Sequence, residues 1–395
     1  MVIQPKVRGF ICTSAHPEGC FKSVESQVKY VKSHGRIDGA KNVLIIGAST
    51  GYGLASRIVS TFACGAKTIG VFFEKSASGK RTASAGWYNT AAFEKLAHEE
   101  GLYAKSINGD AFSDDIKQQT IDLITKDIGK IDLVIYSLAS PRRTHPKSGE
   151  TFNSVLKPMS NTYVNKTVDP IRGEVKEISI EPANEAEVAA TVTVMGGEDW
   201  EFWMDALNEN NLLADNFKTL AYSYIGPELT HDIYTNGTIG AAKQHLQETA
   251  DRLNERYADR GGMAAISVNK ALVTQASSAI PVVPLYMSIL FKYMKEKGTH
   301  EGCIEQMYRL FKDFIYADET PFDDQGRIRI DELEMQDDIQ QKVTELWPQI
   351  NTENLESLTD IVGYRDDFYK LFGFNIDGID YDADVNVDVK IDSID

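Results

Sequence analysis

A glycine-rich turn and a distant tyrosine–lysine pair are the residues whose types and spacing point most directly to chemistry. The turn is Gly47-Ala-Ser-Thr-Gly51-Tyr-Gly53, and Tyr234 is followed nine positions later by Lys243. Glycines let backbone N–H groups approach a phosphate closely, and a nearby ammonium stabilises the anion of a phenol. Together the two patterns predict an enzyme that moves a hydride from a nicotinamide cofactor and then supplies a proton.

The glycine turn lies where a predicted strand meets a predicted helix. Residues 41–49 contain a continuous apolar run, typical of a strand buried on both faces, and residues 54–64 have apolar residues at helical spacing. Free N–H groups at the start of this helix would face the pyrophosphate of a dinucleotide. The order of glycines resembles that of short-chain dehydrogenases more than the common G-x-G-x-x-G pattern.

Glu74 ends the second predicted strand. A carboxylate there can accept hydrogen bonds from the adenosine ribose of NAD and would repel the 2′-phosphate of NADP. Lys75, Lys80 and Arg81 lie close in sequence and weaken that preference. The sequence therefore favours NADH over NADPH and leaves the strictness of the choice open.

Apolar runs that alternate with helical patterns predict a parallel sheet. Further strands are expected at residues 68–74, 102–107, 131–138, 219–225 and 264–268, with helices at 91–100 and 115–127. This order predicts an α/β fold with a doubly wound, Rossmann-like sheet of six strands. Ligands of such sheets bind at the carboxyl ends of the strands, where the candidates are Asp110, Ala111, Leu138 and Ala139.

One large domain over residues 1–395 is expected, with a cofactor-binding core at 41–280. The alternation breaks at 141–217, which predicts an insertion near the cleft containing one or two hairpins and a helix around 198–208. Residues 281–395 are expected to be helical and to cover the active site, ending in a short strand or tail.

Composition and charge exclude several classes of partner. The net charge of −17 argues against nucleic acid and anionic membranes, which bind basic surfaces. No secretory signal is recognisable, and prolines and polar residues interrupt the apolar stretch 271–291, so we expect a cytoplasmic protein. Cys12, His16 and Cys20 offer only three clustered ligands, and we expect no metal site.

The tyrosine–lysine spacing is weak on its own, because the chain contains 17 tyrosines and a chance pair is easy to find. Its position after the fifth predicted strand favours catalysis. Longer matches extend over nearly the whole chain: GFICTSAHPEGC, GASTGYGLASR, AGWYN, GDAFSD, YSLASP, VMGGEDW, AYSYIGPE, SVNKALVTQAS and GFNIDGIDY. With these motifs the chain resembles the trans-2-enoyl-CoA reductases and the related FabV-type enoyl-ACP reductases. The eight-residue gap between Tyr234 and Lys243 is longer than in ordinary short-chain dehydrogenases.

The resemblance implies NADH-dependent reduction of the α,β double bond of an enoyl thioester. It makes Tyr234 the proton donor, Lys243 the residue that holds the cofactor ribose and tunes the phenol, and Tyr224 a substrate contact. The cofactor-binding residues that it implies are Gly47, Ala48, Ser49, Thr50, Gly51, Tyr52, Phe73, Glu74, Asp110, Ala111, Leu138, Ala139, Lys243, Leu272, Val273 and Thr274. No flavin is expected.

Several functions stay open at this stage. The leading hypothesis is a monomeric enoyl-CoA reductase for short chains such as crotonyl-CoA. The first alternative is an enoyl-ACP reductase of bacterial fatty acid synthesis, and the overall acidity favours CoA over the acidic carrier protein. A non-catalytic NADH-binding redox sensor is a further alternative, although a sensor has no need of a proton donor.

Overall fold

The computed structural model describes residues 1–9 and 11–394. Its central sheet consists, in the described residues, of seven strands: β3 (Asn42–Ile46), β4 (Lys67–Phe72), β5 (Ala104–Asn108), β6 (Ile131–Tyr136), β11 (Leu213–Ser223), β12 (Met263–Val268) and β13 (Ile328–Arg329). All neighbours are parallel, in the order β13-β12-β11-β6-β3-β4-β5. The doubly wound parallel sheet predicted from the sequence is confirmed.

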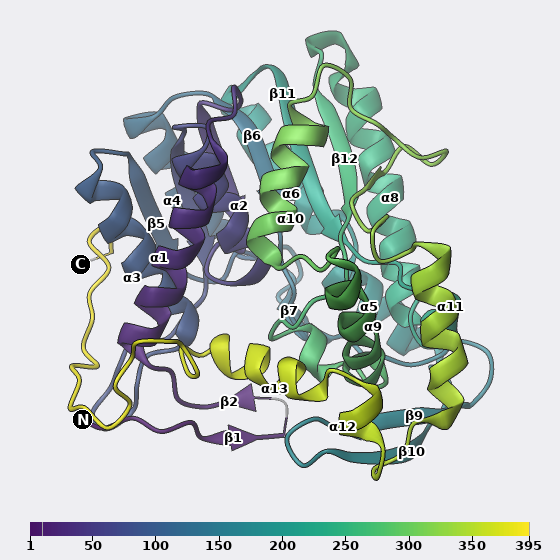
Figure 1. Cartoon of the computed structure of the whole chain (residues 1–395). Coiled ribbons are helices and arrows are strands. Elements are labelled where there is room, and N and C mark those ends of the chain that lie inside the picture. Colours follow the sequence, from purple (N-terminus) through teal and green to yellow (C-terminus); the bar gives the residue numbers. More distant parts are fainter. Residues whose placement is uncertain (10, 395) are drawn as a thin grey trace.

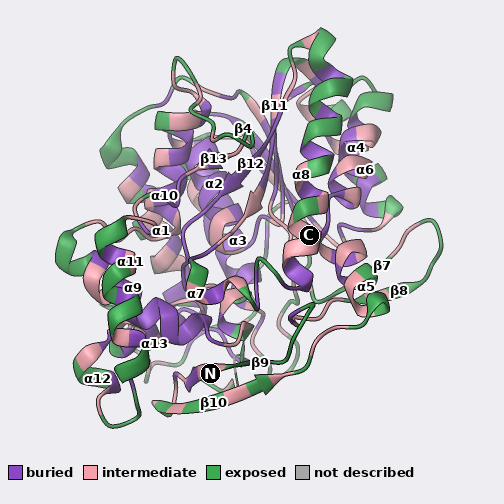
Figure 2. Ribbon diagram, turned by 90° about the vertical axis from the view of Figure 1, so that its right-hand side faces the viewer, coloured by how far each residue is buried: buried purple, intermediate pink, exposed green. Residues whose placement is uncertain are grey.

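Helices cover both faces of this sheet (Figure 1). One face packs against α1 (Pro17–His34), α2 (Gly51–Phe62), α3 (Ala85–Glu99) and α10 (Cys303–Arg309). The other packs against α4 (Asp114–Asp127), α6 (Glu198–Glu209) and α8 (Thr238–Tyr257). Figure 2 shows the buried strands between helices whose outer faces are exposed.

Strand β3 illustrates why continuous apolar runs form this sheet. Val43 and Ile45 belong to the core on one face, and Leu44 and Ile46 belong to the core on the other. Because successive side chains of a strand point to opposite faces, a strand covered on both sides must be apolar at every position. All four of these side chains are fully buried.

The sequence predicted six strands and missed β13. This strand has two residues and pairs with Ser267 and Val268 of β12 at the edge of the sheet. A segment this short shows no periodicity that could distinguish it from a loop.

The predicted insertion contains two antiparallel hairpins. They are β7 (Arg142–Thr144) with β8 (Thr151–Asn153), and β9 (Tyr163–Asp169) with β10 (Glu174–Ile180). The helix predicted at 198–208 is α6, but α5 (Glu185–Met195) was not predicted. Asn184 and Glu187 form a reciprocal capping box at its start, which satisfies N–H groups that would otherwise lack partners.

The C-terminal helices and the N-terminal hairpin lie beyond the carboxyl ends of the strands (Figure 1). The hairpin is β1 (Val7–Arg8) with β2 (Ile11–Cys12), and the helices are α9 (Val283–Lys297), α11 (Asp337–Leu346), α12 (Leu355–Leu358) and α13 (Ile361–Lys370). Shorter elements in the described part of the chain are α7 (Glu228–His231), three 3-10 turns (Ala258–Arg260, Ser277–Ala279, Trp347–Gln349) and a π-helix (Leu310–Ile315). Within the described residues, no helix combines the length and apolar character needed to cross a bilayer.

The end of the chain is a tail, and its described residues form no strand after α13. It runs along α3, where the Trp87 indole donates to the Val389 carbonyl at 2.7 Å and the Ser393 hydroxyl donates to Glu94 at 2.6 Å. The backbone N–H of Ser106, in β5, donates to the Ser393 hydroxyl at 2.8 Å. The tail is thus anchored to both a helix and the outer strand of the sheet.

Candidate active site

The strand order creates a crevice between β3 and β6. From β3 the chain continues to β4 on one side, whereas β6 lies on the other side, and ligands of open α/β sheets bind at such a switch point. Gly47 follows β3 directly and has φ +88°, a conformation that favours glycine. A Cβ atom there would lie 2.1 Å from the Ser137 carbonyl oxygen, so a side chain would force the two strand ends apart.

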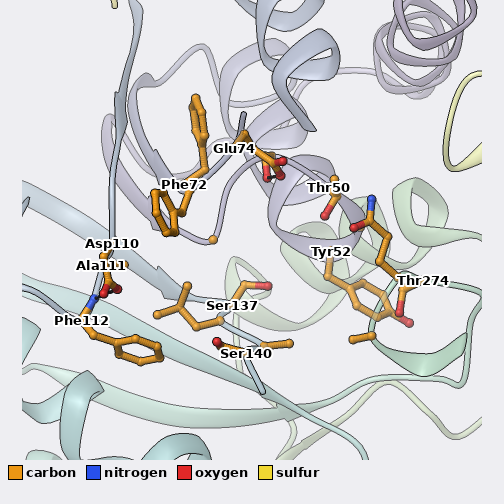
Figure 3. Close-up of a pocket in the computed structure, with 18 of the residues that line it drawn as sticks. Thr50, Tyr52, Phe72, Glu74, Asp110, Ala111, Phe112, Ser137, Ser140 and Thr274 are labelled. Carbon is orange, nitrogen blue, oxygen red and sulfur yellow. Dashed lines mark hydrogen bonds between the residues drawn. The ribbon is translucent and has the colours of Figure 1, made fainter. Parts of the chain in front are cut away.

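A cavity of about 430 Å³ opens at this crevice (Figure 3). The start of α2 borders it, and Thr50 at the N-cap makes no side-chain hydrogen bond to the helix. The first turn of α2 also lacks an acidic residue. Its N–H groups and the positive end of the helix dipole are therefore available to an anion, and the turn fits the pyrophosphate of a dinucleotide.

Glu74 lies on the wall of the first cavity and is held there by its neighbours (Figure 3). The Ser49 hydroxyl donates to its carboxylate at 2.7 Å, and its backbone N–H donates to the Asn108 side chain at 2.8 Å. A Cβ on Gly86 would lie 2.0 Å from the same carboxylate. Phe73 beside it is 77% exposed on the cavity wall. A fixed carboxylate at the end of the second strand suits the ribose hydroxyls of NAD.

Most of the predicted cofactor residues line this first cavity: Gly47, Ser49, Thr50, Gly51, Tyr52, Phe73, Glu74, Asp110, Ala111, Leu138, Ala139 and Thr274. Ala48 and Val273 are buried and do not belong to its lining, and Leu272 lines the neighbouring cavity instead. Sequence reasoning missed Phe72, Gly109, Phe112, Ser137, Ser140, Gln275 and Ala276. Each missed residue lies within two positions of a predicted one. The predicted ends of the strands were therefore a better guide to the cavity lining than the chemical type of each residue.

A second cavity, of about 390 Å³, continues from the first. The two share six lining residues: Tyr52, Ser137, Leu138, Ala139, Thr274 and Ala276. Tyr224, Tyr234 and Lys243 line the second cavity, together with apolar side chains such as Leu156 and Ile280. The structure therefore brings the predicted tyrosine–lysine pair to the same place as the glycine turn.

The loop before α8 places Tyr234. Its carbonyl accepts hydrogen bonds from the backbone N–H groups of Gly237 at 3.1 Å and Gly240 at 3.0 Å. A Cβ on Gly240 would lie 1.8 Å from the Thr235 carbonyl oxygen, so glycine is needed for this close approach. The Tyr234 side chain is 7% exposed, and its hydroxyl has no hydrogen-bond partner within the described chain. The phenol is consequently free to meet a ligand.

Burial shifts both members of the pair toward their neutral forms. It raises the pKa of the Tyr234 phenol well above its usual value and lowers the pKa of Lys243 to about 8. The Lys243 ammonium makes one long hydrogen bond, 3.5 Å to the Tyr222 carbonyl. The wall of the second cavity thus carries a protonated phenol and a lightly bonded ammonium, and the phenol is suited to donating a proton.

Tyr224 packs its ring edge-to-face on Tyr234, with centroids 5.2 Å apart. Its hydroxyl donates to the carboxylate of Glu334 at 3.0 Å. Glu334 is fully buried and also accepts from the Tyr286 hydroxyl and the Ala271 backbone. Sequence reasoning missed Glu334, because it lies in an acidic segment that has the composition of a solvated surface.

Two further polar side chains have structural roles. Arg143 is buried, and its guanidinium donates to Glu198 at 2.8 Å rather than lining either cavity. His16 caps the start of α1 by accepting from Gly19 at 3.2 Å. Among residues 1–9 and 11–394, no group of three or more His, Cys, Asp or Glu side chains could hold a metal ion.

Comparison with protein families matches residues 81–316 to the trans-2-enoyl-CoA reductase catalytic region and residues 2–79 to the NAD(P)H binding domain of trans-2-enoyl-CoA reductase. The chain belongs to the trans-2-enoyl-CoA reductase family. The trans-2-enoyl-CoA reductase [NADH] of Ruminiclostridium cellulolyticum is 59% identical, with all of both chains covered. The enoyl-[acyl-carrier-protein] reductase [NADH] of Coxiella burnetii is 63% identical, covering 100% of this chain and 98% of its own.

Solved structures of two family members agree with the fold. Trans-2-enoyl-CoA reductase from Treponema denticola, in complex with NAD, is 52% identical over 98% of each chain, with a TM-score of 0.94. The enzyme named as that of Clostridium acetobutulicum, in complex with NADH, is 43% identical over 99% of this chain and 100% of its own, with a TM-score of 0.96.

Residues 322–385 match a third family description, an enoyl reductase FAD binding domain. This segment contributes to the C-terminal part of the fold. None of its described residues lines the first or second cavity, and its one strand, β13, leads into turns rather than through a glycine turn into a helix. Helices α11 and α13 instead pack against α9 in the apolar core beyond the sheet.

Proposed function

We propose that the protein is an NADH-dependent reductase of trans-2-enoyl-CoA thioesters, acting on short chains such as crotonyl-CoA. One observation carries the proposal: Tyr234 and Lys243 line a cavity that shares its wall with the dinucleotide cradle. A thioester in the second cavity would meet the reactive end of the cofactor and the phenol together. The NADH-dependent activities in the names of the relatives support the same function.

When bound, NADH supplies the hydride that adds to the β-carbon of the enoyl thioester. Negative charge then develops on the thioester oxygen, and the Tyr234 hydroxyl is the donor placed to stabilise it and to supply the proton for the α-carbon. The raised pKa of Tyr234 keeps that proton in place until charge develops. Lys243, cationic below a pKa of about 8, stabilises the phenolate that remains.

The same proposal assigns the cofactor contacts. The turn at Gly47 and the start of α2 hold the pyrophosphate, Glu74 accepts from the adenosine ribose, and Lys243 contacts the other ribose. Tyr224 contacts the substrate through its ring. The contacts at the cavity wall and the hydrogen bond between Ser49 and Glu74 support these roles.

CoA is the carrier that we favour, because a net charge of −17 disfavours docking of an acidic carrier protein. Reduction of an enoyl-ACP is the alternative, and the 63% identity to an enoyl-ACP reductase supports it. We further propose a cytoplasmic monomer. Four free cysteines suit a reducing compartment, and the C-terminal helices already cover the open end of the sheet.

Loss of NADH absorbance on mixing with crotonyl-CoA tests the function, with NADPH and crotonyl-ACP measured in parallel. Faster turnover of the CoA thioester is expected. A preference for the carrier-protein substrate would establish the alternative, and NADH binding without turnover of either thioester would favour the redox sensor. Sedimentation of the purified protein tests the monomer.

A further inference from the structure

The carboxylate of Glu334 connects two parts of the active site from a distant segment of the chain. It follows β13, outside the matched catalytic region at 81–316, yet it is 0% exposed and lies behind the second cavity. One oxygen accepts the Ala271 backbone N–H at 2.6 Å. The other accepts the Tyr224 hydroxyl at 3.0 Å and the Tyr286 hydroxyl at 2.7 Å.

The hydrogen-bond partners of Glu334 determine which atoms carry the hydrogens in this cluster. An ionised carboxylate only accepts hydrogen bonds, so the Tyr224 hydroxyl donates its single hydrogen to Glu334. Burial raises the pKa of Glu334, while the neighbouring Lys270 ammonium and the hydrogen bonds from Ala271 and Tyr286 act in the opposite direction and favour the carboxylate. Burial raises the pKa of Tyr224, and the negative charge of Glu334 raises it further, so this phenol is a poorer acid.

Tyr234 lies against Tyr224 and differs from it in this respect. Their rings meet edge-to-face with centroids 5.2 Å apart, and both line the second cavity. Within the described residues the Tyr234 hydroxyl has no partner, whereas the Tyr224 hydroxyl is bound to Glu334. Two neighbouring phenols therefore face one substrate space with unequal freedom to give up a proton.

We infer that Glu334 is a positioning residue for the reduction. It holds the Tyr224 ring against Tyr234, retains the Tyr224 hydrogen, and so leaves Tyr234 as the member of the pair that protonates the substrate. The Ala271 N–H aligns the carboxylate for this task by occupying its second oxygen. The inference rests on the proposed reductase function and adds a residue that acts through Tyr224.

A double-mutant cycle tests whether Glu334 acts through Tyr224. Glu334→Gln keeps the shape but replaces one acceptor with an amide NH₂, which cannot satisfy both the Ala271 N–H and the two tyrosine hydroxyls. We expect kcat/KM for crotonyl-CoA to fall about ten-fold in the otherwise wild-type protein, as for loss of a charged hydrogen bond. In the Tyr224→Phe background, the same substitution should change it less than about two-fold.

Glu94→Gln is the matched control. Glu94 is another fully buried glutamate; it accepts hydrogen bonds from Ser106 and Ser393 and lines neither active-site cavity. We expect it to lower Tm while leaving kcat/KM unchanged. Glu334→Asp provides a second variant if Glu334→Gln folds poorly, because it keeps the buried charge beside Lys270 and withdraws the oxygens by one methylene.

Equal effects of Glu334→Gln or Glu334→Asp in both Tyr224 backgrounds would overturn the inference, since the residue would then act on stability or on another group. Wild-type turnover tests the reductase function separately. A crystal structure of Glu334→Gln gives a readout that needs no turnover. A Tyr224 ring displaced from Tyr234 supports the inference, and an unmoved ring with its hydroxyl still bound at position 334 refutes it.

Discussion

Removing the Tyr234 hydroxyl should abolish turnover without weakening the fold. The Tyr234 ring packs edge-to-face on Tyr224, and phenylalanine would keep that contact. The hydroxyl has no hydrogen-bond partner among the described residues, so Tyr234→Phe leaves no protein group unsatisfied. We expect the free energy of unfolding to change by less than about 0.5 kcal/mol. Loss of a general acid should lower kcat about 10²- to 10⁴-fold, equivalent to about 3–5 kcal/mol in the barrier.

The assay is NADH oxidation with crotonyl-CoA, beside thermal unfolding of the same samples. Tyr103→Phe is the matched control: the Tyr103 hydroxyl donates to Asp127 at 2.8 Å, and neither residue lines the first or second cavity. Its loss should cost about 1 kcal/mol of stability and leave turnover intact. The reasoning is refuted if Tyr234→Phe retains more than about a tenth of the wild-type kcat, or if it unfolds several degrees earlier.

Three further predictions concern the cofactor and the lysine. Gly47→Ala should abolish NADH binding, measured by fluorescence titration, because the new methyl group would lie 2.1 Å from the Ser137 carbonyl; Gly51→Ala, with φ +54° but its nearest atom at 3.7 Å, should cost only about 1 kcal/mol of stability. Glu74→Ala should lower the ratio of kcat/KM for NADH over NADPH at least about ten-fold, since it removes the charge that repels a 2′-phosphate; an unchanged ratio would contradict that role. For Lys243, whose buried ammonium loses its proton with a pKa of about 8, kcat/KM should fall as the pH rises through that value, and Lys243→Met should be slow throughout and lack this limb. In the unfolded chain the pKa of this lysine returns to about 10.4. Between about pH 8 and 10 the unfolded chain therefore binds more protons than the folded protein. Lys243 therefore contributes a rise in stability with pH in that window, which Lys243→Met should remove.

The sequence located the first cavity because each part of it leaves a local pattern. Val43 to Ile46 form a strand that is buried on both faces, and Gly47 occupies a backbone conformation that favours glycine. The pattern could not identify β13, whose two residues pair only after the chain has folded back to the edge of the sheet. Nor could it identify Glu334, since burial of one carboxylate among many acidic residues depends on contacts with Tyr224 and Tyr286, far away in the sequence. The roles of Tyr234 and Lys243 came from the family resemblance more than from their spacing.

The anchored tail has a consequence for solubility. β5 ends the sheet on one side, and an edge strand presents unpaired backbone groups to any other extended chain. Ser393 occupies the Ser106 N–H on that edge, while the opposite edge, β13, is only two residues long. The tail and the shortness of β13 each reduce the number of backbone groups open to intermolecular pairing, but the two arise at different times during synthesis. Ser106 of β5 precedes Ser393 of the tail by 287 residues, so the ribosome makes the strand long before the segment that covers its edge. Until the segment around Ser393 has been made, the nascent chain carries a β5 edge without this cover, and aggregation at this stage depends on how soon the segment docks.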